Sequence, residues 1–149
     1  MDLTQIVTSD LIRARETAEL IRGNRAVPLI PDERLREMCF GSWEGQPVAR
    51  LSPDIWHRLQ FESDQLKSES LEQAYMRVKE SLSSYPLTDN ILFVTHGAML
   101  KIIAYYTTYP DQFDYDGFVP RFSDLWISNL TLGKWDPLNP EKGLIFDEK

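Results

Sequence analysis

The chain has 149 residues, 42% hydrophobic and 26% charged, with a formal net charge of -7. This composition predicts one globular domain over 1–149 and excludes a disordered chain. The acidic balance argues against nucleic-acid binding. No apolar run approaches membrane-spanning length, so we expect no membrane partner. One cysteine, Cys39, and an opening without a secretory pattern favour a cytoplasmic location.

The first predicted elements are a strand, a helix and a second strand. β-Branched residues followed by capping residues predict a strand over 5–8. A helix follows, with Ser9 or Asp10 at its start and Gly23 at its end. The segment 27–30, "VPLI", predicts a brief edge strand. The apolar positions of the helix recur at helical spacing: Leu11, Ala14, Ala18 and Ile21.

The middle of the chain predicts a loop and then two helices. The pattern breaks into a Gly-containing loop over 31–47, and a helix is predicted through 54–60. Ser70 and Gln73 form a candidate capping box for another helix over 71–85. The side chains of this second helix that are expected to face the core are Leu71, Ala74, Val78 and Leu82.

The segment 90–96, "NILFVTH", is the clearest strand in the sequence. It is apolar on both faces, as strands inside α/β sheets are, so we expect it to be buried. A helical pattern resumes over 97–109, and 123–132 and 143–148 predict two more strands. Strands that alternate with helices predict a layered α/β fold.

His96 lies where the predicted buried strand ends and a helix begins. Ligands in open α/β sheets collect at the carboxyl ends of strands, close to helix amino ends, and free amides there favour an anion such as phosphate. Gly97 would let the backbone approach that ligand closely. The alternative is a core histidine that binds a carbonyl group. The position of His96 between strand and helix favours a site.

Two further residues are candidates for the same chemistry. Arg13 sits early in the first predicted helix, and its planar fork suits phosphate oxygens. The alternative is a surface charge paired with Glu16. Glu37 lies in the irregular loop near Phe40 and Trp43, where shielding would raise the pKa of its carboxyl and suit a general acid. The alternative is a solvated loop glutamate.

Four motifs then carry a family resemblance: "TSDLIRARETAELI", "LREMCFGSWEG", "ESLEQAYMRV" and "ILFVTHGAML". Their residues and order resemble the histidine phosphatase superfamily, the phosphoglycerate mutase-like group of mutases and phosphomonoesterases. The resemblance extends from Ile6 to about Leu132. It implies an α/β fold built as a three-layer α/β/α sandwich.

The resemblance also implies roles for the candidate residues. Arg13 matches the arginine that grips the transferred phosphoryl group, Glu37 the proton donor to the leaving oxygen, and His96 the second histidine, which stabilises the phosphoryl oxygens. The three residues form the expected catalytic set, and Arg13, His96 and Gly97 form the expected substrate-binding set. The expected ligand is a small phosphorylated metabolite or inorganic phosphate. No metal or cofactor is expected, because cationic side chains supply the charge stabilisation.

The family's first motif, Arg-His-Gly at the end of a first strand, is absent from this sequence. Its histidine is the nucleophile and forms a phosphohistidine intermediate. A full-length form that carries this motif is expected to hydrolyse or transfer phosphate monoesters, whereas we expect little or no turnover from this chain. The alternative is a non-catalytic phosphate-binding or protein-interaction module. His57 is interpreted as a structural or surface residue and Cys39 as a packed one.

The missing first strand also has consequences for the sheet. Because that strand lies inside the sheet of the family, its loss would leave apolar strand edges without a partner. We therefore expect a rearranged sheet, or self-association of the chain through the unpaired edges.

Overall fold

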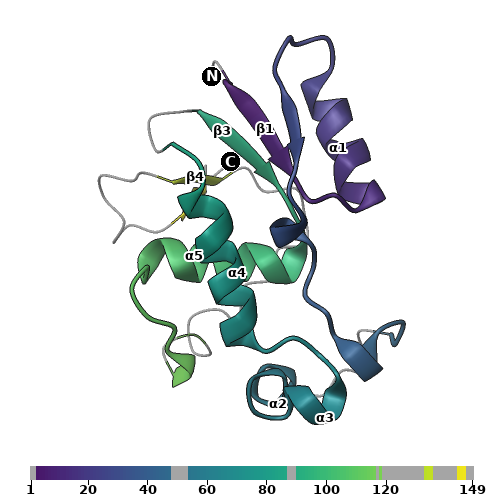
Figure 1. The fold of residues 1–149 in the computed structure, drawn as a ribbon, viewed down its shortest axis with the longest axis vertical. Coiled ribbons are helices and arrows are strands. Elements are labelled where there is room, and N and C mark those ends of the chain that lie inside the picture. The colour runs from purple at the N-terminus through teal and green to yellow at the C-terminus, as the bar shows by residue number, and fades with distance from the viewer. Residues whose placement is uncertain are drawn as a thin grey trace.

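The structure is a computed structural model that describes residues 3–47, 54–86, 90–116, 118, 133–135 and 144–146. Figure 1 shows its helices and strands, which follow in chain order as β1 (Gln5–Thr8), α1 (Ile12–Arg22), β2 (Leu29–Pro31), α2 (Ile55–Phe61), α3 (Ser63–Leu66), α4 (Leu71–Ser83), β3 (Ile91–Val94), α5 (Gly97–Thr108), β4 (Gly133–Trp135) and β5 (Leu144–Phe146). Two short 3₁₀ turns, η1 (Glu33–Leu35) and η2 (Gly41–Trp43), lie between β2 and α2.

The described strands form two sheets. β1 is the central strand of a three-stranded parallel sheet in the order β2-β1-β3, and β4 pairs with β5 in an antiparallel ribbon. Parallel neighbours require crossover connections, which α1 provides between β1 and β2. The parallel sheet confirms the predicted α/β class. Its register includes Ile6 opposite Leu29 and Leu92, and Thr8 opposite Pro31 and Val94.

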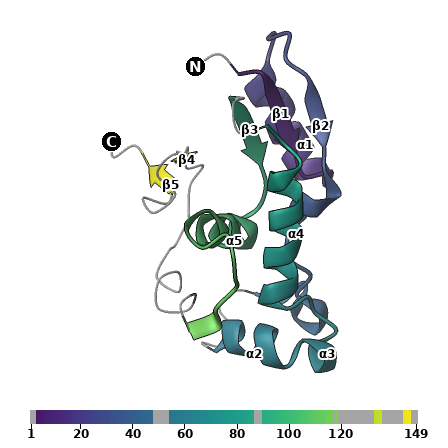
Figure 2. The same ribbon diagram turned by 60° about the vertical axis from the view of Figure 1, so that its left-hand side comes forward.

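Successive side chains of β1 point to opposite faces of the parallel sheet, and the two faces contribute to different core clusters. Ile6 packs with Ala14 and Ala18 of α1. Val7 belongs to the larger core cluster on the other side, where α4 and α5 pack against each other. Figures 1 and 2 show α1 along one side of the strands and the crossed pair α4 and α5 beyond their carboxyl ends. These layers match the predicted three-layer α/β/α sandwich.

β3 differs from its predicted burial. Only Val94 is buried, whereas Ile91, Leu92 and Phe93 are half-buried. The reason is that, among the described residues, β3 pairs with β1 alone and forms one edge of the sheet. The strand predicted over 123–132 lies outside the described residues, and the one predicted over 143–148 is confirmed as β5.

Helix caps are partly as predicted. Ser70 and Gln73 form both bonds of the capping box, the Gln73 N–H donating to Oγ of Ser70 (3.1 Å) and the Ser70 N–H to Oε1 of Gln73 (2.8 Å). Gly23 ends α1 with φ of +53°, as expected of a glycine cap. The prediction that Ser9 or Asp10 caps α1 is wrong: Leu11 holds that position without a side-chain bond. Asp10 instead accepts from Nε–H of Arg36 (2.7 Å), and the partner of Ser9 is described below.

The loop between β2 and α2 packs closely on α3. Gly41 has φ of +57°, and a Cβ there would lie 2.1 Å from the carbonyl oxygen of Leu66. Only glycine fits this backbone contact. In the part of the chain that the structure describes, none of the helices has both the length and the apolar character that crossing a bilayer requires.

Candidate active site

The carboxyl ends of β1 and β3 bring the candidate residues together. Thr8 and Val94 are opposite each other in the register, and the Ser9 N–H donates to the carbonyl of Val94 (2.8 Å). The two segments therefore leave the sheet side by side. One leads directly into the first turn of α1, which carries Arg13, and the other places His96 at the N-cap of α5.

Arg13, His96 and Ser9 form one hydrogen-bonded chain. Nε–H of Arg13 donates to Nδ1 of His96 (3.3 Å), and Nε2 of His96 lies 2.9 Å from Oγ of Ser9. Because Nδ1 is an acceptor here, the neutral ring carries its hydrogen on Nε2, and Nε2–H donates to Ser9. Two bonds therefore fix both the orientation and the tautomer of His96.

His96 is held in its neutral form. Its side chain is buried, with 8% of the residue exposed. Burial, followed by the positive charges of Arg13 and Arg77, lowers the pKa of His96 from 6.5 to about 4. At neutral pH the imidazole is uncharged, and the local positive charge resides on the two guanidinium groups.

Arg13 keeps most of its donors available. The residue is exposed, and within the described part of the chain its only hydrogen bond from the guanidinium is Nε–H to His96. The alternative pairing with Glu16 does not occur among the ion pairs of the described residues. Four of the five N–H donors of this guanidinium can therefore meet an anion.

Glu37 lies against the amino end of α5. Its Oε1 accepts from the N–H of Met38 (3.0 Å), and its Oε2 accepts from the N–H of Ala98 (3.4 Å). Burial raises the pKa of Glu37, and bonds from backbone N–H groups and the charge of Arg13 oppose that rise. The amide of Ala98, expected to be free for an anion, is thus shared with a side chain of the protein.

Gly97 is the first residue of α5 and is exposed. A Cβ built on it meets no atom of the described residues within 4 Å, and its φ is not in the left-handed region. Neither internal packing nor backbone conformation demands glycine at this position. Open space beside His96 is compatible with the close approach of a ligand.

The other nucleophile candidates have different surroundings. His57 is exposed on α2, where its ring contacts Phe61 and Tyr115 (centroids 4.8 and 6.0 Å apart). Cys39 is exposed, so the prediction that it is packed is wrong. It lies in the loop after Glu37, and its Sγ is 3.8 Å from the carbonyl oxygen of Lys67.

Comparison with known proteins identifies the family. The sequence profile of the histidine phosphatase superfamily (branch 1) matches residues 1–118. The chain belongs to this superfamily. It is 30% identical over 107 residues to a probable phosphoglycerate mutase of Yersinia enterocolitica, an alignment that covers 66% of this chain and 50% of that protein. The chain spans about half the length of the curated relatives it matches.

Solved structures support the fold of the superfamily. YhfR of Bacillus stearothermophilus superposes with a TM-score of 0.68 at 27% identity, covering 99% of this chain and 73% of that one. The α-ribazole phosphatase of Shigella flexneri gives a TM-score of 0.60 at 22% identity, covering 79% and 61%. The phosphoglycerate mutase-like α/β fold predicted from the motifs is confirmed.

Ser9 is the residue of this candidate site that the sequence analysis did not identify. It was interpreted as a helix cap, but its hydroxyl is buried and binds His96. The available signal was the pairing of two motifs, since residues that follow neighbouring parallel strands lie side by side. The N–H of Leu11 also donates to Ser9 (3.3 Å), so its oxygen is held from two sides.

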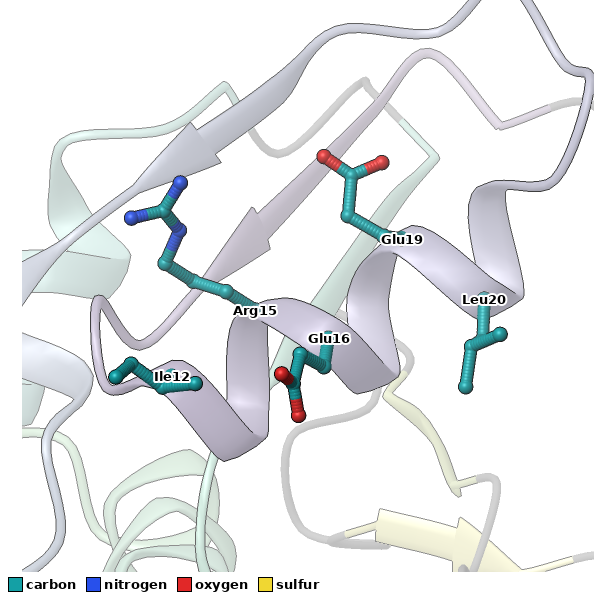
Figure 3. Close-up of a pocket in the computed structure, with 5 residues that line it drawn as sticks. All are labelled: Ile12, Arg15, Glu16, Glu19 and Leu20. Atoms are coloured by element: carbon teal, nitrogen blue, oxygen red, sulfur yellow. The ribbon is translucent and has the colours of Figure 1, made fainter.

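A surface hollow lies elsewhere, on the outer face of α1 (Figure 3). Ile12 and Leu20 are 73% and 83% exposed there. The described residues that line this hollow include none of Arg13, Glu37 or His96. In the described residues no group of three or more His, Cys, Asp or Glu side chains is arranged to hold a metal ion. The expectation of a metal-free site stays a prediction.

Proposed function

We propose that Arg13, His96 and Gly97 bind the phosphate group of a small phosphorylated metabolite, or inorganic phosphate. The observation that carries this proposal is the contact between Arg13 and His96. These two residues are 83 positions apart in the sequence and meet beyond the carboxyl ends of β1 and β3. The available N–H donors of Arg13 suit phosphate oxygens, and the space beside Gly97 leaves room for them.

A bound phosphate dianion would also change the protonation of its neighbours. Its negative charge offsets Arg13 and Arg77, so the pKa of His96 would rise. Nδ1 would then carry a hydrogen and donate to the phosphate instead of accepting from Arg13. The pKa of Glu37, already raised by burial, would rise further beside a second anion. A protonated Glu37 is the form that a general acid needs.

In a longer form that carries the Arg-His-Gly motif, these residues would support hydrolysis or transfer of phosphate monoesters. An imidazole nitrogen attacks phosphorus in line, and the bond from phosphorus to the ester oxygen breaks as Glu37 protonates that oxygen. Water then attacks the phosphohistidine, giving a proton to Glu37, and the N–P bond breaks to release phosphate. Arg13 and His96 stabilise the charge on the equatorial oxygens in both steps.

The chain itself is proposed to have little or no turnover. Its sequence contains two histidines, His57 and His96. His96 accepts a hydrogen bond from Arg13 and donates one to Ser9, and His57 packs against the rings of Phe61 and Tyr115. Neither arrangement presents an activated imidazole to a phosphate held by Arg13.

The absence of the Arg-His-Gly motif from this sequence also supports a second candidate. This candidate is a non-catalytic relative that binds phosphate or a protein partner through the same site. The enzyme and a phosphate-binding form of this second candidate both predict phosphate binding, and they differ in whether the reaction can be restored. A cytoplasmic location, inferred from the single cysteine, applies to either candidate and is tested by cell fractionation.

The test is turnover of p-nitrophenyl phosphate by the chain with and without a peptide that carries the Arg-His-Gly motif. Little activity alone and a gain with the peptide would support the enzyme, provided that a peptide with alanine in place of histidine gives none. Phosphate binding without rescue would favour the non-catalytic candidate. Activity of the bare chain that survives His96→Ala would refute the site assignment.

A further inference from the structure

The backbone just before Glu37 is held by side chains from two other elements. Nη1 of Arg77, on α4, donates to the first and third carbonyls of the segment 34–36 (2.6 and 2.9 Å). Oγ1 of Thr95, between β3 and α5, donates to the middle carbonyl (2.7 Å). All three carbonyls that precede the candidate general acid therefore accept a hydrogen bond from outside the loop.

Arg77 is itself fixed by contacts on its other sides. Its Nε and Nη2 bind the two carboxylate oxygens of Glu69 (2.8 and 2.7 Å), a paired arrangement that sets the plane of the guanidinium. Nη2 also lies 3.5 Å from Sδ of Met99, a buried residue in the first turn of α5. Arg77 thus joins the loop that carries Glu37 to the helix whose amino end Glu37 contacts.

We infer that Arg77 is a positioning residue for the general acid: it holds segment 34–36 so that the carboxyl group of Glu37 stays against the amino end of α5. Thr95 supports the same placement through the middle carbonyl. The inference rests on the proposed role of Glu37 as proton donor, because only then does the position of this carboxyl group matter for function. Arg77 acts through the backbone and is not proposed to touch the substrate.

A purely structural arginine would affect stability and leave Glu37 where it is, so the test must report on Glu37 itself. The measurement is the pH titration of its side-chain carboxyl by ¹³C NMR in the full chain without phosphate, with Glu37→Gln used to assign the signal. Arg77→Met should move the Glu37 pKa down toward that of a solvated glutamate, since the released loop loses the burial that raises it. Arg77→Lys, which keeps a cationic donor but lacks the fork, should restore part of the effect.

Arg22→Met is the matched control. Arg22 is a half-buried arginine in an ion pair with Glu19, on α1, and in the described structure it makes no bond to segment 34–36. This variant should titrate like the wild type at Glu37. Thr95→Val removes one carbonyl bond while keeping the side-chain shape, and a smaller shift in the same direction is expected.

An unchanged Glu37 titration in folded Arg77→Met overturns the inference. If that variant does not fold, Arg77→Lys and Thr95→Val decide, and an unchanged titration in both overturns it equally. The proposed function is tested separately by adding inorganic phosphate to the wild type. Absence of phosphate binding there would defeat the proposed function while leaving the Glu37 titration readable.

Discussion

Acidification from pH 7 to pH 4 is expected to destabilise the folded chain through His96. Because the pKa of His96 is lowered from 6.5 to about 4, the unfolded chain binds a proton in this range that the folded chain excludes. The stability that depends on a neutral His96 is therefore fully present above pH 6.5 and is lost as the pH falls toward 4. Each tenfold difference in proton affinity is worth about 1.4 kcal/mol, so the loss reaches about 3 kcal/mol.

The assay is urea unfolding followed by tryptophan fluorescence at a series of pH values, for the wild type and for His96→Asn. Asparagine keeps one donor and one acceptor for Arg13 and Ser9 but does not titrate in this range. The comparison removes the contribution of carboxyl groups, which both chains share. Between pH 7 and pH 4 the wild type should lose about 3 kcal/mol more than the variant. Equal losses in the two chains would refute the argument that burial, together with the charges of Arg13 and Arg77, holds His96 neutral.

Three further predictions follow from the glycines and the sheet edge. Gly41→Ala should cost about 3 kcal/mol more unfolding free energy than Gly45→Ala, because both have positive φ but only Gly41 abuts a backbone carbonyl; equal costs in urea unfolding would contradict this. Gly97→Ala should leave the free energy of unfolding unchanged or raise it by about 0.5 kcal/mol. The same change should weaken phosphate binding about tenfold, as measured by calorimetry, and an unchanged affinity would exclude Gly97 from the site. The chain should self-associate with rising concentration through the edge of β3 that is unpaired among the described residues, as measured by light scattering after size exclusion. A monomer at all concentrations would contradict this prediction.

Elements with a local cause could be predicted from the sequence. β1 was located at its observed residues because β-branched side chains and a following turn mark it, and the capping box of α4 was found because both of its bonds lie within one turn. The candidate site was predicted as far as Arg13 and His96, which follow neighbouring strands of one parallel sheet. The family resemblance implied a proton-donor role for Glu37, but its contact with the amino end of α5 was not predicted.

Features set by distant neighbours could not be predicted. Ser9 is a residue type that often caps helices, but its hydroxyl is hydrogen-bonded to His96, which is 87 residues away in the sequence. The apolar sequence of β3 predicted a buried strand, whereas its exposure depends on how many strands pair with it. Arg77 occupies an ordinary helical position, and nothing local indicates that its guanidinium reaches the carbonyls of another loop. In each case tertiary contacts determined the outcome.

The most direct test of the site is an NMR titration of the His96 ring with inorganic phosphate, in a His57→Gln chain that leaves one imidazole to observe. If phosphate binds beside Arg13 and His96, the ring ¹⁵N signals should shift with saturation and the midpoint of the His96 pH titration should move upward. The same chain carrying Arg13→Met should show neither change. Ring ¹⁵N signals that do not shift when phosphate is added, or that shift equally in the Arg13→Met chain, would contradict the account.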